Sequence, residues 1–207
     1  MNSKRTARNQ QIADLVFAAI ISAIIIIMIF VPQFGFITLS ATTSVTIVHI
    51  PVLAGTIVLG RRYGILFGTI FGLGAMIMSF SSLPTDAPFT NPLLSVLPRI
   101  IFGYLIVFIY DGFNKFIKNR YVSIPLTMGV ATLVHSLMVI PILYLFVKAD
   151  FYFFVNSYIY REDIVGEQFF LFIYGLFIAN SIFEIILAIL IGTTVTIPLL
   201  IIKENYR

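Results

Sequence analysis

Residues 15–60 read LVFAAIISAIIIIMIFVPQFGFITLSATTSVTIVHIPVLAGTIVLG, a run without a single Asp, Glu, Lys or Arg. One membrane crossing by a helix needs about 20 apolar residues, so a run of this length is enough for two crossings. Pro32, Gly35 and the polar cluster from Thr38 to Ser44 interrupt the run midway. The run therefore predicts two transmembrane helices, at about 14–31 and 45–60.

The rest of the chain continues in the same way. Further apolar segments predict helices at about 63–80, 98–113, 123–147 and 168–202, the last being longer than one bilayer requires. Of the 207 residues, 59% are hydrophobic and only 11% are charged, which leaves no room for a separate soluble domain. The sequence thus predicts an all-α polytopic membrane protein of six transmembrane helices, folded as one domain over 1–207.

The distribution of basic residues predicts the orientation. With the N-terminus in the cytoplasm, only Arg99, Lys148 and Arg161 fall outside, and the other Lys and Arg residues fall inside. Cytoplasmic segments of membrane proteins are enriched in Lys and Arg, so both termini are expected to be cytoplasmic. The external connections are then the longer ones, among them the aromatic loop 148–167, and function should face outward.

Polar side chains at membrane depth are the candidates for a binding site, because they are costly in lipid unless they line a cavity or find a partner. His49 is expected a few residues below the outer surface, and Asn180 and Glu184 share one helix face at a similar depth. Asn91, Ser95 and Arg99 belong to the external connection before the fourth helix. Two of these residues have a structural alternative. The alternative for His49 is hydrogen bonding within the fold, and that for Arg99 is extension of its charged group to the surface. His135, deeper in the membrane, is interpreted as a packing residue.

Several function classes are excluded by what the sequence lacks. The basic residues lie in short clusters between apolar runs, which fits membrane topology and not nucleic-acid binding. A phosphate-binding loop, a nucleophile motif and a metal-ligand spacing are all missing, and the sequence has no cysteine. We therefore expect no catalytic residue, no cofactor and no metal, and a protein that is not itself an enzyme.

Three stretches resemble a known family: Thr46-Ile-Val-His-Ile-Pro-Val52, the turn Leu59-Gly-Arg-Arg-Tyr-Gly64, and Asn91-Pro-Leu-Leu-Ser-Val-Leu-Pro-Arg99. They are similar to the substrate-binding S components of energy-coupling factor (ECF) vitamin transporters, and most similar to the pantothenate-type branch. The resemblance covers the first four predicted helices.

The resemblance implies a six-helix protein of the bacterial cell membrane that binds a vitamin near its outer face. It implies a transmembrane coupling subunit and two ATPases as partners, with the loaded subunit toppling in the bilayer to deliver its ligand. In this family an A-x-x-x-A pattern on the first helix docks the coupling subunit, and Ala19 and Ala23 occupy that pattern here. Small residues at this spacing let another helix approach closely, although packing within the chain is the alternative.

The expected ligand is pantothenate, whose single carboxylate needs a cation. Arg99 is the favoured anchor, because its planar fork can hold a carboxylate through two hydrogen bonds at a helix start. Other vitamins or precursors, such as pyridoxine, hydroxymethylpyrimidine or folate compounds, remain alternatives within the class. A secondary transporter would predict internal repeats, and an intramembrane enzyme would use Glu184 with a histidine. Neither a repeat nor a nucleophile is found.

Overall fold

The computed structural model describes residues 2–40, 43–81, 88–148 and 167–205, and these residues are almost entirely helical. Five helical segments in this part of the chain are long and apolar enough to cross a membrane: Arg8–Phe30, Arg61–Ser79, Pro92–Phe116, Arg120–Leu143 and Ile178–Asn205. The prediction of an all-α polytopic membrane protein is confirmed at this level. Arg161 and the aromatic loop between Lys148 and Glu167 lie outside the described residues.

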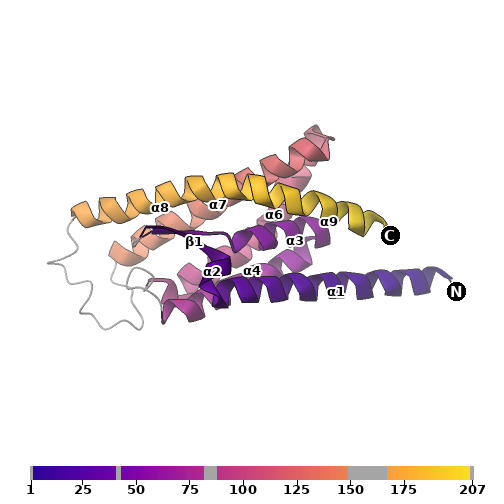
Figure 1. The fold of residues 1–207 in the computed structure, drawn as a ribbon, viewed down its shortest axis with the longest axis horizontal. Helices are drawn as coiled ribbons and strands as arrows, with labels where there is room; N and C mark the ends of the chain where they lie inside the picture. Colours follow the sequence, from indigo (N-terminus) through magenta and orange to yellow (C-terminus); the bar gives the residue numbers. More distant parts are fainter. Residues whose placement is uncertain (1, 41–42, 82–87, 149–166, 206–207) are drawn as a thin grey trace.

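The elements follow one another as α1 (Asn2–Phe30), α2 (Pro32–Gly35), β1 (Phe36–Ser40), β2 (Thr43–Thr46), α3 (His49–Leu59), α4 (Arg61–Ser79), α5 (Pro92–Ser95), α6 (Leu97–Phe116), α7 (Arg120–Lys148), α8 (Glu167–Leu187), the π-helix η2 (Ala188–Gly192) and α9 (Thr193–Asn205). The start of α1 and the end of α9 lie at the same end of the bundle (Figure 1). We call this the terminal end. The β-hairpin lies toward the opposite end, which we call the distal end (Figure 1).

The second helix differs from its prediction. Residues 36–40 and 43–46 form a two-stranded antiparallel sheet in which Phe36 pairs with Thr46, and α3 begins only at His49. Gly60, whose φ of 94° suits glycine best, ends α3 after 11 residues. At 1.5 Å per residue α3 is about 16 Å long, roughly half of the hydrocarbon core. The predicted span 45–60 was wrong at its start, because the strand-forming Thr and Val residues of 43–46 pair with 36–40 and cannot be helical.

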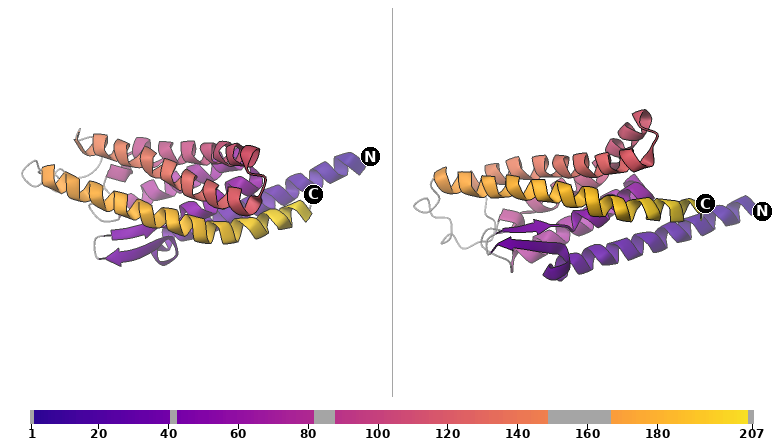
Figure 2. Two further views of the ribbon diagram at one scale, coloured as in Figure 1. Left: turned by 90° about the horizontal axis from the view of Figure 1, so that it is seen from above. Right: turned by 45° about the horizontal axis from the view of Figure 1, so that its top comes forward.

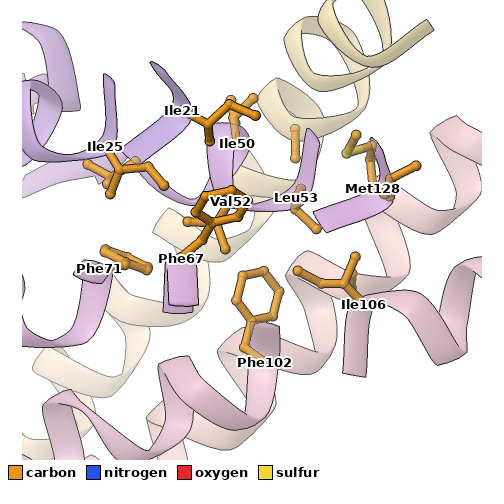
Figure 3. Packing of buried hydrophobic residues seen from close by; sticks show 14 of the residues in the cluster. Ile21, Ile25, Ile50, Val52, Leu53, Phe67, Phe71, Phe102, Ile106 and Met128 are labelled. Atoms are coloured by element: carbon orange, nitrogen blue, oxygen red, sulfur yellow. The ribbon is translucent and has the colours of Figure 1, made fainter. Parts of the chain in front are cut away.

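Short α3 is the centre of the structure. It packs against α1, α4, α6, α7, η2 and α9, and all of its residues from His49 to Val58 are buried except Pro51. Figure 3 shows Val52 and Leu53 of α3 among apolar side chains of α1, α4, α6 and α7, including Ile25, Phe67 and Phe102. The outward faces of the long helices carry exposed Ile, Leu, Val and Phe side chains, as expected for surfaces in contact with lipid.

Glycines join α4 to α6. A Cβ atom on Gly64 would collide with the carbonyl oxygen of Gly103, and one on Gly68 with the carbonyl oxygen of Arg99. Gly72 meets the backbone of Val96 in the same way. The glycine face of α4 therefore packs the chain against itself, because glycines one turn apart let two helix backbones approach closely.

The last helical run is longer than a bilayer. Segments α8, η2 and α9 follow one another without a break over 167–205 and cross the whole bundle in Figure 1. Near 1.5 Å per residue this run is about 58 Å long, so part of it must extend beyond the hydrocarbon core. The first turns of α1 likewise project past the end of α9 (Figure 2).

Candidate functional site

Arg99 is placed on the first turn of α6 and is turned inward. Only 7% of the residue is exposed, so it does not snorkel to the surface. Its Nη1 donates to the carbonyl oxygen of Leu94 at 2.6 Å, and its guanidinium carbon lies 5.2 Å from the ring centre of Phe89 and 5.7 Å from that of Phe71. Its Nε is buried and has no hydrogen-bond partner in the described part of the chain. The Nε–H donor of a buried cation is therefore available to an anion.

Two histidines lie beside one another in the same region. The rings of His49 (first residue of α3) and His135 (α7) stack with centres 6.4 Å apart, and the ring of Phe102 lies 4.7 Å from that of His135. Both histidines are at least nine-tenths buried, and neither Nε2 has a hydrogen-bond partner among the residues described. A neutral imidazole nitrogen donates or accepts according to its tautomer, so both can serve a polar ligand.

His49 begins α3 and lies about 15 Å along the helix from Leu59 at its other end. The hairpin directly precedes this position. The packing of α3 on α7 brings His49 beside His135, which the sequence had assigned to packing alone.

Glu184 connects α8 to the hairpin. Its Oε1 accepts a hydrogen bond from the backbone N–H of Thr46 at 3.1 Å, three residues before His49. Glu184 and Arg99 are close enough to attract each other electrostatically. Among the described residues, however, their side chains do not form a direct ion pair. Asn180 lies one turn earlier on α8 and is half-buried. The hairpin, α3 and α8 thus meet where the polar cluster of Arg99, His49, His135 and Glu184 gathers.

Asn91 and Ser95, which precede Arg99 in the chain, hold the backbone of this region in place. The Oδ1 of Asn91 caps α5 by accepting from the N–H of Leu93 at 2.9 Å, and the Oγ of Ser95 donates to the carbonyl oxygen of Gly72 at 3.2 Å. Both side chains are buried. Their best-defined roles are structural, and direct contact with a ligand stays a prediction for both residues.

The sequence therefore selected most members of this cluster and missed His135. His135 and His49 are 86 positions apart and on different helices, so no spacing rule could join them; only the packing of α3 on α7 does so. The neighbouring Ser136, also buried, was the available signal of a polar position in an apolar helix. Lys148 ends α7, while Arg161 is outside the described residues, so neither can be compared with Arg99 as an anchor.

Chemically the cluster suits binding. It offers a cation whose Nε–H donor has no partner among the described residues, two imidazole nitrogens and a carboxylate, with Phe rings nearby. Within the described residues no three His, Cys, Asp or Glu side chains form a group that would hold a metal ion.

The small residues of α1 face away from the bundle. Ala19 and Ala23 are both exposed, whereas Ala18, Ile21 and Ile25 of the same helix are buried against the core. This exposure disfavours the alternative that Ala19 and Ala23 serve packing within the chain. They form part of an outward surface with Ile20 and Ile24.

Comparison with known proteins adds three findings. The chain matches the family described as "ECF transporter, substrate-specific component" over residues 13–196. It is 26% identical over 210 residues to a "Pantothenate transporter PanT" of Leuconostoc mesenteroides, covering 95% of this chain and 97% of that protein. It is 23% identical over 214 residues to a "Pantothenic acid transporter PanT" of Lactococcus lactis subsp. cremoris, covering 96% and 98% respectively.

Proposed function

Because this chain belongs to the family of ECF transporter substrate-specific components, a family of membrane transport subunits, we propose that it captures pantothenate for import. The observation that carries the substrate assignment is Arg99, a buried guanidinium whose Nε has no partner in the part of the chain that the structure describes. Burying a cation is costly unless an anion or hydrogen bonds compensate it. A ligand carboxylate would supply that compensation, and the two relatives named as pantothenate transporters support this choice of acid.

In this proposal the carboxylate lies against the Nε edge of Arg99. His49, Asn180 and Glu184 then provide donors and acceptors for the amide and the two hydroxyls of pantothenate, while Asn91 and Ser95 hold the loop that positions Arg99. The Phe residues around Arg99 and His135 exclude water, which strengthens each polar contact with the ligand.

Import requires energy from elsewhere. We propose that Ala19 and Ala23 dock a transmembrane coupling subunit, which joins the chain to two ATPases, and that the loaded subunit topples in the bilayer. The exposed position of both alanines on an apolar helix supports this interface, because small side chains allow two helix backbones to approach closely.

The membrane topology belongs to the same proposal. Six crossings, with α3 and its hairpin forming the second, would leave both termini in the cytoplasm of a bacterial cell. The shared position of the two termini at one end of the bundle supports an even number of crossings (Figure 1). Arg61, Arg62, Lys115 and Arg120 lie at the ends of α4, α6 and α7 on that side, as expected for the cytoplasmic side.

The test is to purify the chain and identify the co-eluting small molecule by mass spectrometry, then to titrate pantothenate and its uncharged alcohol analogue. We expect pantothenate to co-elute and to bind without ATP, and more tightly than the alcohol. Recovery of a different vitamin would assign the chain to another branch of the family. Ion-driven accumulation by the chain alone would make it a secondary transporter.

A further inference from the structure

A buried lysine stands near the end of the last helix. Lys203 lies close to the C-terminal end of α9, where a lysine normally extends its ammonium group into water. Instead only 7% of Lys203 is exposed. Its Nζ lies 3.0 Å from the Oδ1 of Asp14 on α1 and donates to the carbonyl oxygen of Val58 on α3 at 2.8 Å. We call this three-residue arrangement the Lys203 clasp.

The clasp is not a generic surface ion pair. The neighbouring pair Arg120–Glu204 has the same 3.0 Å separation, but its side chains are 40% and 54% exposed, against 8% and 30% for Lys203 and Asp14. Exposed pairs contribute little because water and salt screen them. A buried ammonium instead loses much of its hydration and is retained only where its partners are well placed.

The clasp holds a part of α1 whose large apolar side chains are mostly exposed. The buried stripe of α1 consists of Ala18, Ile21, Ile25 and Ile29, and Asp14 continues this stripe by one turn toward the terminal end. Ile12, Leu15 and Val16 are each more than half exposed. Asp14 therefore provides a polar attachment of this part of α1 to the rest of the bundle.

That attachment is close to the proposed docking surface. Ala19 follows Asp14 by five residues on the same helix. A rotation or tilt of α1 would therefore move the docking surface. The other end of the clasp is the carbonyl of Val58, which belongs to α3, the buried central helix. The α9 helix packs on α3 and α7, so Lys203 spans from this body to α1.

We propose that Lys203 is a positioning residue for assembly: it fixes the angle of α1 against α3 and so presents Ala19 and Ala23 to the coupling subunit. This inference rests on the proposed function, since it presupposes that α1 docks that subunit. Lys203 acts through Asp14 and Val58 and touches neither the ligand site nor, in this proposal, the partner.

The experiment measures binding of the purified chain to an ECF module, meaning the coupling subunit with its two ATPases, chosen because it supports uptake with the wild-type chain. The variants are Lys203→Met, Asp14→Ala, their combination and Lys203→Arg. Arg120→Met is the matched control, because it breaks an ion pair of equal length on the surface of the same end. Pantothenate affinity is measured for every variant as a readout that a loss of folding would lower.

We expect Lys203→Met and Asp14→Ala each to weaken module binding by about tenfold or more, with the double variant no weaker than either, since the two residues act as one unit. Lys203→Arg should keep most of the binding and Arg120→Met all of it, with pantothenate affinity within about twofold throughout. Asp14→Ala leaves the Lys203–Val58 hydrogen bond in place, so it still reports on α1 if Lys203→Met does not fold.

Module binding by Asp14→Ala and Lys203→Met equal to that of Arg120→Met would overturn the positioning role. So would a parallel loss of pantothenate binding, which would make the clasp a general stabiliser of the fold. Ala19→Trp is included to test the docking surface itself. Full module binding by that variant would reject the docking surface, whatever the Lys203 variants show.

Discussion

The carboxylate anchor is the prediction with the sharpest physical content. Arg99→Ala removes a guanidinium whose Nη1 already donates to the carbonyl oxygen of Leu94. The Nε and Nη2 groups are then the pair that can meet a carboxylate side by side. Hydrogen bonds to charged groups contribute about 1.5–3 kcal/mol each. Two of them at the lower limit give about 3 kcal/mol, which is roughly a 100-fold loss of affinity.

The assay is a binding titration with pantothenate and with its uncharged alcohol analogue, on the wild-type chain and on Arg99→Ala, Arg99→Lys and Arg99→Met. Arg99→Met keeps the apolar stem between the Phe71 and Phe89 rings, so it separates loss of charge from loss of packing. Arg99→Lys keeps the charge without the planar fork and should restore only part of the affinity. The same change to Ala at Lys148 or Arg161 should cost less.

The comparison of the two ligands decides the matter. If Arg99 holds the carboxylate, the wild-type chain prefers the acid, and the preference disappears in Arg99→Met. Equal affinities of the wild-type chain for acid and alcohol would refute the anchor and remove much of the case for pantothenate. Arg99 would then be a structural residue that orders α5 through Leu94.

Three further outcomes are expected. Glu184→Ala should weaken pantothenate binding by about 1–3 kcal/mol, while Glu184→Gln, which can still accept a hydrogen bond from the hairpin backbone, should lose less affinity. If both variants bind like the wild type in a titration, Glu184 has no role in binding. Gly68→Ala should lower the free energy of unfolding by about 1–3 kcal/mol, because the added Cβ meets the backbone of α6, whereas Gly112→Ala, which places its Cβ in open space, should not. Equal melting temperatures of the two variants would contradict the α4–α6 packing. Ala19→Trp should abolish uptake by the full transporter and leave pantothenate binding intact, with Leu137→Trp on exposed α7 as the control; uptake that survives in the Ala19 variant would show that the partner docks elsewhere.

Local sequence was enough for the long helices and the class of protein. The apolar runs that became α1, α4, α6, α7 and the α8–α9 run contain spans of 19 to 28 residues, each long enough to cross a bilayer, and no soluble alternative buries them. The glycines at 64, 68 and 72 share one helix face, a spacing that favours the close helix contact seen between α4 and α6. Patterns within one helix are legible because each depends on neighbours three or four positions away.

The grouping of the polar residues was decided by tertiary structure. Nothing near His49 in the sequence shows that residues 36–40 pair with 43–46, because strand pairing and helix formation compete for the same Thr and Val residues. The hairpin delays the start of α3 to His49, and the packing of α3 on α7 then brings His49 beside His135. In the sequence, Lys203 likewise indicated only the cytoplasmic side of the membrane. The packing of α9 on α3 turns its ammonium group toward Asp14. Contacts between helices depend on how whole faces fit together, and that information is not contained in any single stretch of the chain.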